Sequence, residues 1–148
     1  MATSGVYPVY KNQFKINTAG RSGGGGGSTM VEIADMESFS VSFDDNVEEW
    51  TPMTTEGWTR RMKTGKGVTI SLSGKRNVGD AGNDYVAGLA WKSGQDCNSE
   101  LEWKFPNGDK VLLPCVINVT SAGGDSTNVE PLEFECMSDG KPEFTPAE

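Results

Sequence analysis

Hydrophobic and polar residues alternate over several stretches of this sequence, and this pattern predicts β-strands. Residues 38–43 place Phe39, Val41 and Phe43 on one face and serines on the other. A period of two is what a half-buried strand requires. The same alternation predicts further strands over residues 68–74, 100–105, 110–120 and 129–137.

Turn and proline signals mark where strands end or lie at the border of a sheet. The Asn107-Gly108 pair separates two predicted strands and is a strong hairpin signal. Pro114 lies inside a predicted strand, and proline cannot donate a ladder hydrogen bond, so this strand is expected at an edge or at a bulge. Pro8 likewise predicts an edge strand or an extended arm over residues 6–16.

One segment has helical instead of alternating spacing. Residues 81–92 follow Asp80, which can cap a helix, and Asn83 is a second candidate cap. Gly94 lies where a glycine commonly ends a helix. The apolar stripe consists of Tyr85, Val86, Leu89 and Ala90. We therefore expect one short helix, at about 81–92, on one side of a sheet.

Together these elements predict the fold class. The chain has 148 residues, of which 19 are glycine, and a length of this order fits one domain with a substantial core. We expect residues 1–148 to form a single, mainly-β domain, an antiparallel β-sandwich or barrel with one short flanking α-helix, long loops and extended termini.

A glycine-rich segment covers residues 17–30. Its composition is that of a flexible chain. It is either a long mobile loop inside the domain, since both flanking segments have strand patterns, or a linker introduced by engineering.

Residues 44–62 predict two strand extensions joined by a polar loop at 52–57. Large apolar residues lie among the charges of this segment: Trp50, Met53, Trp58 and Met62. Two interpretations are open. The tryptophans cap one end of the core, or the segment is a projecting hairpin that packs on a partner.

Charge is arranged in blocks along the chain. The net charge is −8, which disfavours a general nucleic-acid-binding surface. Residues 30–58 contain acids and no base, whereas residues 59–76 contain bases and no acid. Such blocks either pair as adjacent strands of one fold or let an acidic face of one subunit meet a basic face of its neighbour.

No residue pattern predicts catalysis or a cofactor. The chain has no histidine, which excludes Ser-His and Cys-His nucleophiles, and residues 65–76 lack the spacing of a phosphate-binding loop. We expect no enzymatic activity, no cofactor and no metal. Asp80, Asn83 and Asp84 have side chains that suit calcium, but a helix cap explains them as well.

Three cysteines stand at wide, irregular spacing: Cys97, Cys115 and Cys136. They lack the paired spacing of zinc ligands. We expect reduced, partly buried thiols, with one disulfide pair as the alternative. No apolar run approaches the ~20 residues that a membrane span needs, and the N-terminus has no signal-peptide pattern. These observations predict a protein made in the cytoplasm and without a membrane partner.

The order of elements resembles the tail tube (major tail) proteins of long-tailed bacteriophages, a family related in fold to the type VI secretion tube protein. The resemblance covers most of residues 5–145. Its motifs are "KGVTISLSGKRNVGDAGNDYVAGLAW", "ELEWKFPNGDKVLLPCVINV" and "PLEFECMSDGKPEF", the last with a G-x-P turn. The five-glycine run departs from the family pattern and leaves the length of the first loop open.

The resemblance implies a structural virion subunit. Six copies would join sheets edge to edge into a ring, and rings would stack into a hollow tube through which DNA passes during ejection. The implied partners are further copies of the chain and the tail tip or baseplate, tape measure and tail terminator proteins. DNA would contact the subunits only while it passes through the lumen. The implied location is the virion tail, assembled in the host cytoplasm.

Residue roles follow as expectations from the same resemblance. The candidate ring-to-ring contact is the 44–62 loop, with Trp50, Met53, Trp58, Arg60 and Arg61. The arm with Tyr7, Pro8 and Tyr10 and the tail with Phe144 are further contacts, expected to become ordered only on assembly. The lumen candidates are Glu100, Glu102, Glu133 and Glu135.

Two alternative functions remain open at this point. One is a monomeric β-sandwich module that binds carbohydrate or a surface through an aromatic platform of Trp50, Trp58 and Trp103. The other is a tail-terminator or capsid-decoration subunit, which would stop at a single ring or trimer. A toxin or enzyme is a more distant reading.

Overall fold

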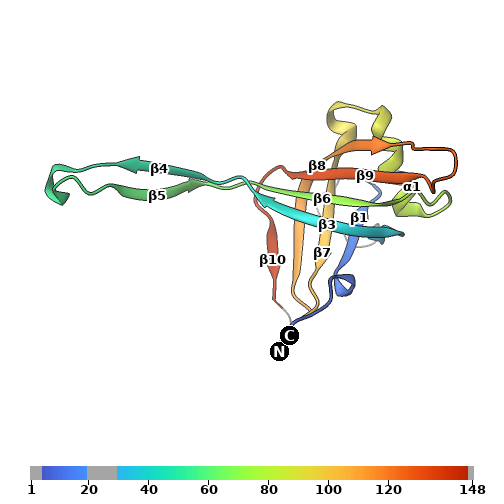
Figure 1. Cartoon of the computed structure of the whole chain (residues 1–148), viewed down its shortest axis with the longest axis horizontal. Helices are drawn as coiled ribbons and strands as arrows, with labels where there is room; N and C mark the ends of the chain where they lie inside the picture. Colours follow the sequence, from blue (N-terminus) through green and yellow to red (C-terminus); the bar gives the residue numbers. More distant parts are fainter. Residues whose placement is uncertain (1–4, 20–29, 147–148) are drawn as a thin grey trace.

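A computed structural model describes residues 5–19 and 30–146, and antiparallel strands dominate it (Figure 1). The body contains one eight-stranded sheet in the order β2-β1-β7-β8-β9-β6-β3, with β10 paired to β8, and β4 and β5 form a separate pair. The strands are β1 (Gln13–Asn17), β2 (Met30–Glu32), β3 (Met36–Phe43), β4 (Asn46–Trp50), β5 (Arg60–Gly65), β6 (Val68–Lys75), β7 (Asn98–Lys104), β8 (Lys110–Ala122), β9 (Pro131–Ser138) and β10 (Glu143–Thr145).

Strand β8 is 13 residues long and belongs to two layers. Its residues 110–116 pair with β7, and its residues 115–122 pair with β9. The sheet therefore folds over along β8, which brings β1 and β7 against β3. Phe14 of β1 and Phe39 of β3 meet with ring centroids 4.8 Å apart, and Trp103 of β7 lies 5.5 Å from Phe39. The mainly-β class is confirmed.

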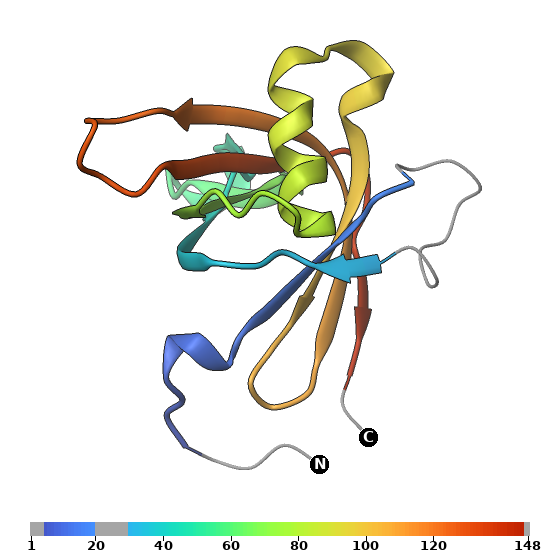
Figure 2. The same cartoon turned by 90° about the vertical axis from the view of Figure 1, so that its right-hand side faces the viewer.

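The core lies between these layers and is closed on one side by a helix. The fully buried side chains come from β1, β6, β7, β8 and β9, and include Ile16, Ile70, Leu101, Leu113 and Phe134. Helix α1 (Ala81–Gly88) and the 3₁₀ turn Leu89–Trp91 add Val86 and Leu89. The helix packs against β1, β2 and β8, and Figure 2 shows it in yellow-green across the strands.

The residues at the start of α1 act as a helix cap. Asp80 accepts hydrogen bonds from the backbone N–H groups of Asn83 (3.0 Å) and Ala34 (3.2 Å). Asn83 is fully buried and bonds the backbone at Ala34, Lys75 and Asn77. This network uses the oxygens considered for calcium. The helix expected at 81–92 is present, with its last turn tightened to 3₁₀ geometry.

Two edge predictions are wrong. β1 lies between β2 and β7, although residues 5–12 do precede it as an arm. β8 is central, and Pro114 lies between the segment paired with β9 and the segment paired with β10, residues 110–112. The Pro114 carbonyl accepts from Asp139, and in a strand the N–H points to the same side as the carbonyl. The Pro114 nitrogen, which has no hydrogen to donate, therefore faces the gap between β9 and β10, where no ladder hydrogen bond is needed.

The glycine-rich segment falls mostly outside the described residues, which omit 20–29. The strands on either side of it, β1 and β2, pair antiparallel in the register Lys15 with Glu32. The prediction of strands on both sides is thus confirmed, while the conformation of the segment stays a prediction.

Candidate assembly surfaces

A two-stranded hairpin extends from the body as a continuation of β3 and β6 (Figure 1). Its strands pair Trp50 with Arg60 and Glu48 with Met62. Every residue of β4 is exposed, and so is every residue of β5 except Gly65. The projecting segment predicted at 44–62 is therefore present, and the interpretation that its tryptophans cap the core is wrong.

The opposite charge blocks meet inside this hairpin. Arg61 bonds Glu49 at 2.9 Å, and Lys63 bonds Asp45 at 2.9 Å. The hydrogen bond from Lys63 is the main cause that lowers the pKa of Asp45 below its usual value. The acidic and basic blocks thus pair largely as adjacent strands of one chain, and exposed pairs of this kind stabilise it only weakly.

The tip of the hairpin has a defined shape. The Thr55 hydroxyl lies 2.9 Å from the carbonyl oxygen of Pro52 and 2.7 Å from that of Trp58, and the two carbonyls share its one proton. The Trp58 N–H donates to the Thr55 carbonyl at 3.0 Å. Glu56 and Gly57 both have left-handed backbone conformations, with φ of 52° and 89°. Because these bonds fix the turn, the tip presents its side chains without further ordering.

The side chains at this tip are strongly apolar and open to solvent. Met53 is 97% exposed and Trp58 is 79% exposed, while Trp50 is 41% exposed and lies under the Arg60 guanidinium, 5.6 Å from its ring centroid. An isolated two-stranded hairpin is marginally stable in water. Exposed aromatic and methionine side chains on such a ribbon indicate a surface that a partner covers.

The aromatic platform considered for a carbohydrate-binding module is not present. Trp103 lies in the body, stacked on Phe14 at 5.9 Å, and donates its indole N–H to Asn12. Trp50 and Trp58 lie on the projecting hairpin, so the three rings do not share a surface.

A second surface is the outer face of the layer formed by β3, β6, β9 and the second half of β8. Cross-strand pairing aligns Ser40, Ser71, Glu135 and Asn118 in one row. The neighbouring row contains Ser38, Ser73 and Glu133. The opposite face carries the core residues. Two rows of this face thus consist of hydroxyl, amide and carboxylate groups, while the next row, Ser42, Thr69, Met137 and Val116, includes two apolar side chains.

The same layer ends in two unpaired strand edges. Among the described strands, β3 pairs only with β6, and residues 117–122 of β8 pair only with β9. Open edges present free backbone N–H and carbonyl groups, which other chains can extend.

The four acidic lumen candidates fall in different places. Glu133 and Glu135 lie on the polar outer face just described. Glu102 pairs with Lys15 and Leu112 in the other layer. Glu100 is only 7% exposed and accepts a 3.0 Å hydrogen bond from the Asn17 amide. The alternation that placed Glu100 on an open face is wrong at this residue, because the amide of Asn17 draws its carboxylate inward.

The terminal segments expose aromatic residues. Tyr7 is 37% exposed and Tyr10 is 81% exposed, near the 3₁₀ turn Val9–Lys11. Phe144 is 58% exposed but belongs to β10, which pairs with β8 within the same chain. The expectation that the tail around Phe144 becomes ordered only on assembly is therefore wrong.

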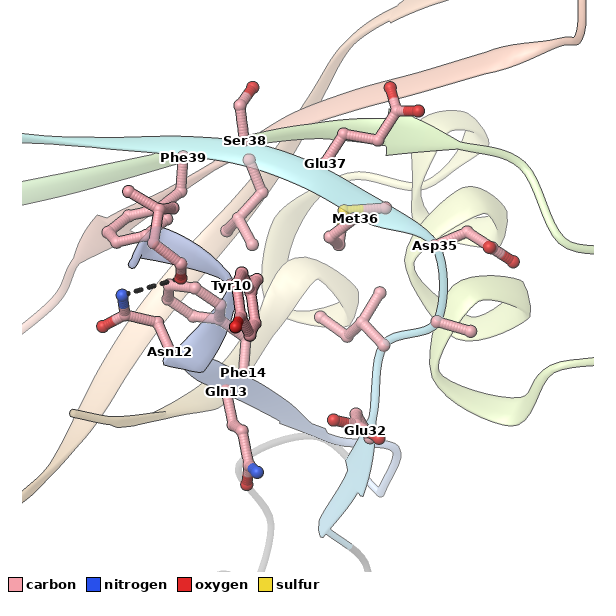
Figure 3. A pocket seen from close by; sticks show the side chains of 14 residues that line it. Tyr10, Asn12, Gln13, Phe14, Glu32, Asp35, Met36, Glu37, Ser38 and Phe39 are labelled. Atoms are coloured by element: carbon pink, nitrogen blue, oxygen red, sulfur yellow. Dashed lines mark hydrogen bonds between the residues drawn. The ribbon is translucent and has the colours of Figure 1, made fainter. Parts of the chain in front are cut away.

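A small pocket of about 380 Å³ lies between the arm, β1 and the start of β3 (Figure 3). Tyr10, Phe14 and Met36 form its apolar part, and acids stand at its rim. Of these acids, Asp35 accepts from Asn77 and Glu37 binds Lys75. The two carboxylates thus connect the start of β3 to the end of β6 and the turn after it.

The cysteines, which all lie in the described part of the chain, show no arrangement for redox or metal chemistry. All three cysteines are buried thiols that form no disulfide, as expected, and the disulfide alternative is wrong. Within residues 5–19 and 30–146, no group of three or more potential ligands is placed to hold a metal ion. In the same residues no helix has the length and apolarity to cross a membrane.

Comparisons with known proteins agree with this architecture. No protein-family model matches the sequence, and no curated protein matches it. Among solved structures, a chain in the tail of an empty gene transfer agent particle with C6 symmetry superposes with a TM-score of 0.74 at 18% identity, over 95% of this chain and 100% of the other.

A chain of the virion of a native gene transfer agent particle gives a TM-score of 0.71 at 17% identity, over 95% of this chain and 100% of that chain. The superpositions cover all of the other chain and 95% of this one, so the agreement extends over the architecture as a whole. The protein therefore has the fold of a chain that occurs in the tail of phage-like gene transfer agent particles.

Proposed function

We propose that this chain is a structural subunit of a phage-like tail, in which hexameric rings stack into a hollow tube for the passage of DNA. The observation that carries the proposal is one sheet layer with two open edges and a mainly polar outer face, joined to a projecting hairpin. Six copies per ring agree with the C6 symmetry of the similar tail.

Ring closure uses the two open edges. The β3 edge of one copy pairs with residues 117–122 of β8 in its neighbour, so that every copy contributes four strands to one closed barrel. Closure removes both edges from solvent and with them the risk of uncontrolled aggregation.

The polar face of that layer lines the lumen. In this arrangement Glu133 and Glu135 point toward the channel from every copy. Carboxylates repel the phosphates of passing DNA, and serine and threonine hydroxyls keep the wall wet, so the DNA does not stick. Glu100 and Glu102 have no place in this lining.

The hairpin joins successive rings. Its tip holds Met53 and Trp58 in solvent in the isolated chain, and aromatic anchors of this kind are the residues that dominate interface energies. The tail tip, tape measure and tail terminator remain the expected partners at the ends and inside of such a tube, with the virion tail as the location.

Negative-stain electron microscopy across a concentration series tests the proposal. The wild-type chain should form hollow tubes with regular striation. A variant that lacks residues 51–57 keeps two residues between the paired Trp50 and Arg60, and Trp58→Asn with Thr59→Gly makes them a favourable turn. It should stay a folded monomer that does not polymerise. Tubes of normal length from this variant would contradict the role of the hairpin, and a wild-type chain that stops at single rings would indicate a terminator.

A further inference from the structure

An apolar groove of about 740 Å³ opens at the end of the body where the hairpin begins. Its walls come from both layers: Val41 and Phe43 from β3, Val68 from β6, and Val111 and Phe144 from β8 and β10. Phe43 is 66% exposed and Phe144 is 58% exposed. At this end the two layers leave their inner faces uncovered, whereas α1 closes another side of the core.

The groove has a definite chemical character. Its aromatic wall continues the ring contacts of the core. The ring centroid of Phe105 lies 4.4 Å from that of Trp103 and 6.2 Å from that of Phe144. The charged residues that line it are Lys66 and Lys141, and no acid lines it. The groove therefore suits an apolar segment that carries a negative charge.

Among the described residues, the hairpin tip and the N-terminal arm each carry more than one exposed apolar side chain, and charge distinguishes them as occupants of the groove. The hairpin tip, residues 51–59, contains Met53 and Trp58 and a single charged residue, Glu56. The N-terminal arm, residues 5–12, contains a single charged residue as well, but this is Lys11. Lysine at a groove lined by lysines is repelled, whereas Glu56 is attracted.

The tip cannot reach the groove of its own chain. Phe43 and Val68 line the groove and also lead into the hairpin, so the tip stands at the far end of a ribbon that points away from it (Figure 1). We propose that the groove binds the hairpin tip of a second copy, with Trp58 and Met53 inserted between the layers and Glu56 beside Lys66 and Lys141.

This inference rests on the proposed function and specifies its stacking contact. The tip and the groove are different surfaces of one chain, so the contact is heterologous and repeats without closing on itself, as a stacked polymer requires. The tip is already fixed by the bonds of Thr55, which reduces the entropy lost on binding.

Cross-linking between two variants tests the contact directly. Glu56→Cys protein is mixed with Lys141→Cys protein and treated with a short bismaleimide, and tubes are counted by electron microscopy in parallel. The native cysteines are buried, so only the introduced thiols react. Val78→Cys, an 80% exposed position beside α1, is the matched control partner. We expect dimer from Glu56→Cys with Lys141→Cys and none above background with the control.

The outcomes separate the two proposals. Tubes without the cross-link to Lys141→Cys, or with a cross-link to Val78→Cys instead, would contradict the proposed contact between tip and groove. The proposal that the chain forms a tube would be unaffected. Absence of both tubes and cross-link at every attainable concentration would count against both. Charge reversal gives a second readout: Glu56→Lys and the pair Lys66→Glu with Lys141→Glu should each weaken association, and the triple variant should restore it. Trp58→Ala should weaken association by about 30-fold, the effect of losing a hot-spot tryptophan.

Discussion

Gly82 and Gly88 are two glycines of one helix that should respond in opposite directions to the same substitution. Both lie in α1. A Cβ atom at Gly82 would stand 2.5 Å from the carbonyl oxygen of Glu32 and 3.2 Å from the Cα of Ile33, whereas a Cβ at Gly88 meets nothing within 4 Å. Gly82 thus lets the first turn of the helix press against the backbone that follows β2.

Two effects set the change in unfolding free energy: helix propensity and overpacking. Replacing glycine by alanine inside a helix stabilises it by about 0.8–1 kcal/mol, and this applies to both positions. At Gly82 an oxygen of the main chain must move, and such overpacking costs about 1–3 kcal/mol. We expect Gly88→Ala to stabilise the protein by up to about 1 kcal/mol, and Gly82→Ala to destabilise it by about 1 kcal/mol.

Urea unfolding followed by tryptophan fluorescence measures both free energies. The comparison belongs in the variant that lacks residues 51–57, because assembly would otherwise add to the apparent stability. A difference of about 2 kcal/mol corresponds to a separation of about 4–8 °C in Tm for a chain of this size. Equal stability of the two variants would refute the close approach of α1 to β2.

Further predictions concern the helix cap, an ion pair and the thiols. Asn83→Ala should cost about 3 kcal/mol in urea unfolding, because it leaves buried backbone groups without partners; a cost below that of an ordinary surface substitution would contradict the network. The Arg76 side chain, with the N–H of Gly79, lowers the pKa of Asp84 below 3.8. The ionised Asp84 therefore stabilises the fold above that pH, and this stabilisation is lost as the carboxylate becomes protonated below it. The Asp84→Asn variant should thus lose less stability than the wild type between about pH 5 and pH 2. The hydrogen bond between the thiols of Cys136 and Cys115, which holds Cys136 in its protonated form, raises the pKa of Cys136 together with burial, so a thiol reagent should modify the folded protein slowly and the unfolded chain at once; fast reaction of the native protein would show that these strands open.

Local patterns predicted the elements whose environment is decided locally. The alternation in β6 and β9 matches their buried and exposed faces, because each has one side on the core. In β3 the predicted inner residues Phe39 and Val41 are half-buried, whereas Phe43 is exposed. The Asn107-Gly108 turn is present, with Gly108 at φ 100°, and Asp80 caps α1 as its position suggests. For residues 44–62 the sequence left two interpretations open, tryptophans that cap the core or a projecting hairpin, and the exposure of β4 and β5 decides for the hairpin.

The errors arise where the deciding contact comes from a distant part of the chain. Pro114 appeared to require a sheet edge or a bulge, yet it lies where β8 changes partner from β9 to β10, which only the tertiary structure fixes. Glu100 became buried through Asn17, which precedes it by 83 residues. The apolar groove combines residues from six strands and the loops beside them, so no single stretch of sequence carries its signal.

The direct continuation of β3 and β6 into the hairpin has a mechanical consequence. A pull on the tip acts along both strands at once and in the same direction, so it slides them as a unit against β9. The ladder between β6 and β9 runs from Thr69 to Lys75 and lies parallel to that pull. Its hydrogen bonds are therefore loaded together in shear, not opened one after another from an end. A chain of such subunits would resist stretching at every junction while each hairpin remained free to bend.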